Sequence, residues 1–298
     1  MTTGQADTSS RRPGPARGSH LAAFGVLGVI AQIAFTAGWL ITETWQGPQY
    51  NAITNAISDM QAATAPHAWF PITCFAAGGI GTFCFAVFGL RPALADAGRV
   101  AAHAPWMLAL AGLAIGNSFP LIPCQLSNPG CTAHHQLYSP GGMTDAIVAT
   151  AAFLVLAFVP GPLWQRLKAL PDWQRLRSVM TAARIICPLC FILLCAASFT
   201  GTAQGLAERA LATSCVLWIG ALAVTLTRVS VTISTGRPAA ASRPASHLGV
   251  VAGPSLARRK RNCRTDNVRA HGRLLRSRAA RRACGRPQDK PGRTRPVS

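Results

Sequence analysis

The chain has 298 residues, half of them hydrophobic and only 13% charged, and its mean hydropathy is +0.27. This balance excludes an ordinary soluble domain with a charged surface and is typical of an integral membrane protein. The net charge of +20 is unevenly distributed. Residues 1–227 hold 11 Lys and Arg against 7 Asp and Glu, whereas residues 228–298 hold 18 against 2.

Six apolar segments approach the roughly 20 residues that a helix needs to cross the hydrocarbon core. They are residues 21–42, 69–90, 100–119, 144–159, 184–200 and 210–227. Residues 1–20 are polar and do not resemble a cleaved signal peptide, so we expect the first apolar segment to be retained as a helix. The sequence thus predicts an all-α membrane protein, with a bundle of six transmembrane helices formed by residues 21–228.

The Lys and Arg residues predict the orientation of this bundle, because short loops rich in these residues stay in the cytoplasm. They precede the first segment and fill the connections between segments two and three and between four and five. The remaining connections, 43–67, 120–142 and 201–209, carry a single basic residue, Arg209. We therefore expect both termini to be cytoplasmic and the bilayer to be the main partner.

Residues 229–298 form an Arg/Pro/Ala-rich tail that is expected to be disordered, because it has too little apolar surface to fold. Its charge suits anionic lipids, and counterion release would also permit nucleic-acid binding, although nothing indicates a specific nucleic acid. Arg, Pro, Ala and Gly have GC-rich codons. We therefore favour a third interpretation, an out-of-frame translation of a GC-rich gene.

The first predicted outer loop contains a helical pattern. Tyr50, Ile53, Ile57 and Met60 recur at helical spacing, which predicts a short helix lying on the membrane surface or covering the mouth of the bundle. Asp59 would then point either to water or across the mouth toward other polar groups.

The second predicted outer loop contains two cysteines. Cys124 and Cys131 enclose a turn-forming Asn-Pro-Gly sequence. Because disulfides persist outside the cytoplasm, we expect these residues to form one that fixes the loop.

Histidines and carboxylates at the predicted outer face are candidate metal ligands, because zinc binds both side-chain types. The candidates are Asp59, His67, His134, His135 and Asp145. No pair has a diagnostic spacing such as HExxH, so the prediction is no cofactor, with zinc as the alternative. Asp145 has a simpler explanation as a carboxylate near a helix amino terminus, with Thr144 as a potential N-cap.

Several motifs together resemble a bacterial integral membrane family named domain of unknown function 998 (DUF998). They are "ISDM" at residues 57–60 preceded by Tyr50, a glycine-rich second helix, "FP" at residues 119–120, and a histidine-bearing loop before helix four. The resemblance covers about residues 21–228. It implies a six-helix protein of a bacterial plasma membrane and brings no established activity or cofactor.

Residue by residue, Ser58 and Asp59 match the family's Ser-Asp-Leu motif, and His134 or His135 matches its loop histidine. Asp145 stands where the family has a second histidine, and this difference weakens the case for a shared metal site.

The leading functional prediction is an uncharacterised multi-pass membrane protein with no demonstrated catalytic activity, whose polar outer face closes over the mouth of the bundle. The first alternative is a metal-dependent lipid hydrolase, broadly like alkaline ceramidases, in which Ser58, Asp59, His135 and Asp145 are the catalytic candidates. The second alternative is a small-molecule or ion transporter. It is disfavoured because the helix interiors contain few ionisable residues, which transport pathways usually need.

Overall fold

The computed structural model describes residues 15–95, 103–116 and 121–234, and within these ranges the chain is helical without strands. The larger helices are α1 (Pro15–Glu43), α2 (Trp69–Cys84), α4 (His103–Gly116), α6 (Pro140–Phe158), α7 (Pro160–Leu167), α8 (Arg177–Thr200) and α9 (Gln204–Ser234). The shorter ones are η1 (Ser58–Gln61), η2 (Phe85–Leu90), α3 (Arg91–Ala93), α5 (Ala133–Leu137) and η5 (Pro171–Leu176). The first 14 residues and residues 235–298 of the predicted tail lie outside the described residues. Residues 229–234, which were predicted to begin the disordered tail, belong to α9 instead.

The predicted class, an all-helical membrane protein, is confirmed. Within the described ranges, five helical stretches are long and apolar enough to cross a membrane: Gly18–Glu43, Trp69–Ala93, Pro140–Leu167, Pro171–Thr200 and Gln204–Thr232. The apolar helix α4 has 14 residues in its described part. Six spans, and the orientation of the termini, therefore stay predictions.

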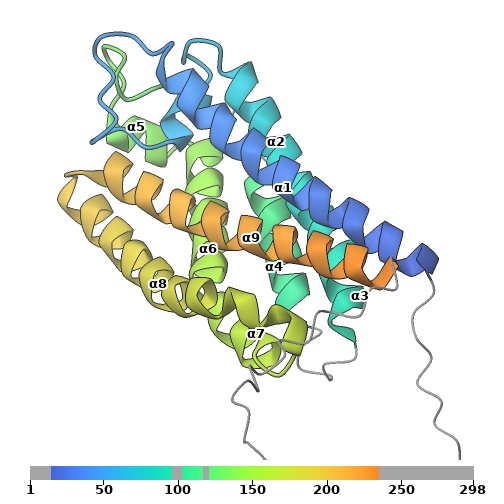
Figure 1. Cartoon of the computed structure of the whole chain (residues 1–298). Coiled ribbons are helices and arrows are strands. Elements are labelled where there is room, and N and C mark those ends of the chain that lie inside the picture. Colours follow the sequence, from blue (N-terminus) through green and yellow to red (C-terminus); the bar gives the residue numbers. More distant parts are fainter. Residues whose placement is uncertain (1–14, 96–102, 117–120, 235–298) are drawn as a thin grey trace, which may run out of the picture. The chain divides into compact units, whose positions relative to one another are not determined.

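The main helices pack in a closed ring that follows the order of the chain. α1 packs on α2, α2 on α4, α4 on α6, α6 on α8 and α8 on α9, and α9 packs back on α1. Figure 1 shows α1 and α9 side by side, so the first and last helices close the ring. Helices α1, α2, α4, α6 and α9 all contribute walls to the interior space described below.

Glycines allow a close approach of α2 and α4. A Cβ atom on Gly79 would lie 2.3 Å from the carbonyl oxygen of Gly112 and 2.4 Å from the Cα of Gly116. Backbones can approach this closely only where both surfaces carry small residues. The three glycines therefore serve packing inside the ring.

The predicted fourth and fifth helices are too short at their basic ends. The helices adjoining the loop near residue 170 begin at Pro160, Pro171 and Arg177, so much of the predicted loop 160–183 is helical. Proline is favourable in the first turn of a helix, where its missing N–H has no acceptor. The long basic side chains can reach water from helix ends, so their charge does not prevent helix formation.

The predicted surface helix in the first outer loop is wrong. Only the single turn η1 forms there, and Ile53 is 54% exposed while Ile57 and Met60 are buried. The Asn51 Oδ1 accepts from the N–H of Ile53 at 2.9 Å, and Asn55 Oδ1 accepts from the N–H of Asn51 at 2.9 Å. Such local side-chain bonds to the backbone compete with helix formation.

Candidate functional site

Two connecting segments, residues 44–68 and 121–139, lie together at one end of the ring (Figure 1), and we call them the cap. The Thr64 Oγ1 joins them, because it accepts from the backbone N–H of Gln125 at 2.9 Å and from Asn128 Nδ2 at 2.8 Å. The cap is therefore held as one unit rather than as two independent loops.

Asp59 is the main polar link inside the cap, and it is 2% exposed. Its Oδ1 accepts from the N–H of Leu126 at 2.9 Å and from Gln136 Nε2 at 2.9 Å, and its Oδ2 accepts from Asn55 Nδ2 at 3.3 Å. Burial raises the pKa of Asp59, although these three hydrogen bonds act in the opposite direction. The carboxyl group thus points toward other polar groups, as one of the two predictions had it, and serves to join the segments.

Arg209 attaches the cap to α9. Its side chain is 10% exposed and forms an ion pair with Glu43, whose side chain is 31% exposed. Its nitrogen atoms reach Glu43 Oε2 at 3.2 Å, the Tyr50 hydroxyl at 2.6 Å and the carbonyl oxygens of Ala52 at 2.7 Å, Asn55 at 3.0 Å and Gly205 at 3.0 Å. One guanidinium therefore joins the end of α1 and the first half of the first cap segment to the last helix.

The Tyr50 hydroxyl accepts its hydrogen bond from Arg209 in a partly buried position. Burial raises the pKa of Tyr50 to about 12, even though the charge of Arg209 lowers it. Sequence reasoning did not assign these two residues to one contact. The signal was present, because Arg209 is the only basic residue in the predicted outer loops.

Glu208 faces in a different direction from its neighbour Arg209, since successive residues of a helix differ by about 100° around its axis. The Glu208 Oε2 accepts from the backbone N–H of Ile57 at 2.8 Å, next to the start of η1. The same side chain lines a pocket inside the ring. Sequence reasoning missed Glu208 because it placed the start of the last helix at residue 210.

This upper pocket lies between the cap and the helices and has a volume of about 70 Å³. About 10–15 Å³ by this measure holds one water molecule, so the pocket has room for a small polar group. The polar side chains in its wall are Ser58, Gln61, Thr144, Asp145 and Glu208. Two are carboxylic acids, and the described residues contribute no Lys, Arg or His to this wall.

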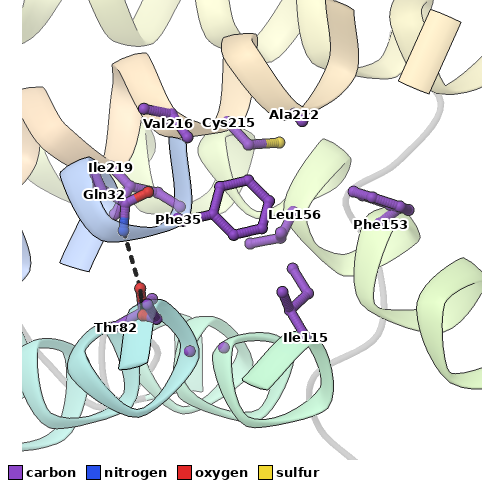
Figure 2. Close-up of a pocket in the computed structure, with 13 residues that line it drawn as sticks. Gln32, Phe35, Thr82, Ile115, Phe153, Leu156, Ala212, Cys215, Val216 and Ile219 are labelled. Carbon is purple, nitrogen blue, oxygen red and sulfur yellow. Dashed lines mark hydrogen bonds between the residues drawn. The ribbon is translucent and has the colours of Figure 1, made fainter. Parts of the chain in front are cut away.

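A lower pocket of about 30 Å³ adjoins the upper one and shares Phe35, Ile115 and Phe153 with it. Its wall is mostly apolar, and Gln32 Nε2 donates to Thr82 Oγ1 across it at 2.9 Å, as Figure 2 shows. We call the two pockets together the chamber. It combines an acidic upper end with an apolar lower end.

The structure separates the predicted catalytic candidates into two groups. Ser58 and Asp145 both line the chamber, whereas Asp59 and His135 have their contacts within the cap and are not part of the chamber wall. The predicted helix N-cap at Thr144 is wrong. Helix α6 begins at Pro140, and its N-cap is Ser139, whose Oγ accepts from the N–H of Gly142 at 3.0 Å. Asp145 therefore sits in the second turn of α6.

The histidines lie against different neighbours. The His67 ring is 5.3 Å from that of Trp45, the His134 ring is 4.5 Å from that of Tyr138, and His135 Nδ1 is 3.7 Å from Cys124 Sγ. No three His, Cys, Asp or Glu side chains in the described part of the chain form a group that could hold a metal ion. The five predicted ligands are thus not brought together.

Cys124 and Cys131 are joined in the structure, with their Cα atoms 6.0 Å apart. The linked segment includes Leu126, whose N–H binds Asp59, and Asn128, whose side chain binds Thr64. The same segment includes Gln125, which bonds Thr64 and Gln46, so the disulfide would hold the segment that supplies most of the hydrogen bonds between the two cap segments.

Comparison with known families matches one family model, described as Protein of unknown function (DUF998), over residues 29–225. This range includes the residues of the chamber and of the contacts that hold the cap. Searches of curated proteins and of solved structures gave no match.

Proposed function

We propose that this chain, which belongs to the DUF998 family, is a membrane-embedded binding protein that holds a small cationic ligand in the chamber. The observation that carries the proposal is the pair Asp145 and Glu208, which face one pocket that has no basic side chain in its described wall. Ionisable residues inside a membrane protein are costly and generally mark a functional site.

The protein compensates these acids only in part. Glu208 accepts from the backbone N–H groups of Ile57 and Ser58 and interacts with the charge of Arg209, whose own hydrogen bonds go to the cap. No hydrogen bond from another described side chain reaches Asp145. A ligand with a protonated amine would supply both positive charge and N–H donors, which offset the cost of burying carboxylates.

The lower end of the chamber favours an apolar group on the ligand. Leu156 and Ile219 line it, together with Phe35, Ile115 and Phe153. Both pockets are small, so a primary amine with a short alkyl chain fits better than a lipid with two acyl chains. The cap lies over the acidic end, so access requires movement of the cap or passage between helices.

The test is calorimetric titration of the full chain in a mild detergent with hexylamine, with hexanol and hexanoate as neutral and anionic controls. We expect saturable binding of hexylamine alone. Asp145→Asn and Glu208→Gln should each weaken it at least about 10-fold, or about 1.4 kcal/mol. The matched control Glu43→Gln removes an acid outside the chamber and should leave binding unchanged. Equal binding of hexanol, or full binding by Asp145→Asn, would contradict the proposal.

Transport is the second candidate, and the chamber gives it new support. The sequence argument against transport was the scarcity of ionisable residues in helix interiors, yet Asp145 and Glu208 lie in helices that line the chamber. Flux of hexylamine into proteoliposomes that is lost in Glu208→Gln would make the protein a transporter. Binding without flux would leave it a binding protein.

Hydrolysis is the alternative with less support. A nucleophile and its base must lie within hydrogen-bond reach, and no hydrogen bond joins Ser58 to Asp145 in the described residues. Metal analysis of the purified chain tests the zinc alternative directly. Near-stoichiometric zinc that disappears in His134→Ala/His135→Ala would replace the binding proposal with a hydrolase.

We further propose six spans with both termini in the cytoplasm of a bacterial cell, the protein being in the plasma membrane. The ring order and the one-sided distribution of basic residues support this arrangement. A reporter fused at Ala63 should be outside, and cytoplasmic activity of that reporter would reverse the orientation.

A further inference from the structure

The end of the ring opposite the cap carries a groove that the proposed function does not use. It lies where α7, η5 and the beginning of α8 meet, and it consists of two open hollows of about 570 Å³ and about 630 Å³. Both hollows are lined by Gln174, Arg177 and Thr181. We call this feature the basic groove.

Four cations line the basic groove: Lys168, Arg175, Arg177 and Arg184. All four are exposed. Among the described residues, Arg209 and Glu43 form the one ion pair. None of the four groove cations therefore forms an ion pair with a described carboxylate. The groove is therefore a concentrated positive site rather than a network of salt bridges.

Buried aromatic residues anchor in the core the helices that form the basic groove. Trp164 and Trp173 are 7% and 3% exposed, and both belong to the main core of the bundle. The Gln174 side chain donates to the carbonyl oxygen of Lys168 and so ties η5 to the end of α7. A site with this support exists before any ligand binds, which lowers the ordering cost of binding.

The groove continues into an apolar surface along α8. Arg177, Thr181 and Arg184 follow one another at helical spacing, and the same side of the helix continues with Ile185 and Ile192, which are 61% and 60% exposed. A cationic end followed by an apolar stripe matches the order of a phospholipid, with a charged head group and then acyl chains.

We infer that the basic groove binds an anionic phospholipid, with the head-group phosphate among Lys168, Arg177 and Arg184 and the acyl chains along α8. Arg matches the geometry of phosphate oxygens because its donors form a planar fork. A soluble phosphate anion shares the head-group chemistry but lacks the chains, so the exposed isoleucines favour the lipid.

The test measures lipid binding by the full chain in mild detergent, with native mass spectrometry of added phosphatidylglycerol or phosphatidylcholine. Working at about 0.5 M salt weakens diffuse attraction to the basic residues elsewhere in the chain. We expect Arg177→Gln/Arg184→Gln to weaken phosphatidylglycerol binding roughly 10- to 30-fold. Each basic residue near an anionic lipid surface contributes roughly 5-fold to the affinity, and the variant removes two of them.

The matched control is Arg91→Gln/Arg228→Gln, which removes the same charge from exposed positions outside the groove. It should retain affinity within about 3-fold. Arg177→Lys/Arg184→Lys should recover most of the binding, because it keeps the positive charges. Circular dichroism of the glutamine variant checks that it is folded.

Three results would overturn the inference. Equal losses in the groove and control variants would mean diffuse charge attraction. Equal binding of phosphatidylcholine would mean that the positive charges do not select the lipid. Displacement of phosphatidylglycerol by millimolar inorganic phosphate would mean that the groove recognises a soluble anion.

Discussion

Replacing Arg209 with alanine should loosen the attachment of the cap to α9. The change removes a 10% exposed guanidinium that reaches five oxygen atoms. Removing one partner of a buried ion pair typically costs about 3–5 kcal/mol. Glu43 is 31% exposed and can regain water, so we expect the lower end of that range, about 3 kcal/mol of unfolding free energy. The lost contact with the Trp39 ring, whose centroid lies 5.9 Å away, is a smaller part of this.

The assay has a global and a local readout. Unfolding in mixed micelles of increasing dodecyl sulfate fraction, followed by circular dichroism, gives the free energy. Amide hydrogen exchange over residues 44–57 reports whether the cap itself loosens, and the N–H of Leu206, which donates to the Ile53 carbonyl at 3.0 Å, should lose protection.

Two further variants make the test specific. Glu43→Gln leaves the buried guanidinium with an amide oxygen in place of the carboxylate and with its four other oxygen partners. It should therefore cost less than Arg209→Ala, about 1–2 kcal/mol. Arg209→Lys keeps the charge but cannot reach all five oxygens, so its loss should be intermediate. The reasoning fails if Arg209→Ala costs less than about 1 kcal/mol, or if exchange in the cap is unchanged.

Three other predictions concern single residues. Burial raises the pKa of Asp59 above its ordinary value, so folding favours its protonated form. The stability of the protein should therefore fall as pH rises through the raised pKa. This part of the pH dependence should vanish in Asp59→Asn when thermal unfolding is followed from about pH 4 to about pH 8. Gly79→Ala should cost about 1–3 kcal/mol because its Cβ has no space, whereas Gly220→Ala, with nothing within 4 Å of the added atom, should be neutral in the same unfolding assay. Tyr50 should ionise only near its pKa of about 12, which ultraviolet titration of a Tyr138→Phe variant would show.

Each of these predictions has a contrary result. A pH profile that is the same with aspartate and asparagine at position 59 would mean that the buried carboxyl group does not titrate differently on folding. Equal stability of the two glycine variants would mean that α2 and α4 do not pack closely. Tyrosinate absorption that develops near pH 10 would mean that the hydroxyl is exposed, since this is the ordinary value for tyrosine.

The sequence predicts the helical membrane class because segment length and apolar composition are local properties that the bilayer selects directly. It does not predict how the helices pair. Contact between α1 and α9 depends on surfaces almost 200 residues apart, and no local pattern records it. The glycines on α2 and α4 mark a close approach, but their spacing alone does not identify the partner.

Errors at the candidate site had two physical causes. The apolar spacing around Ile57 indicated a helix, but Arg209 and the asparagine side chains hold that backbone in turns instead. The last helix begins at Gln204 rather than near residue 210, and this shift places Glu208 in the chamber wall. Boundary errors of one or two turns are small for the fold, yet they decide whether an acid is assigned to a loop or to a pocket.

The closure of the ring by its first and last helices also has a consequence for biosynthesis. As the ribosome delivers the helices in order, α1 must remain in the bilayer with one side uncovered until α9 follows it. The chamber walls and the Arg209 contact are likewise incomplete until that moment, because both depend on α9. A nascent chain that is stopped before residue 204 would expose the apolar interior to lipid or to quality-control proteases, so the whole site is assembled by the final insertion step.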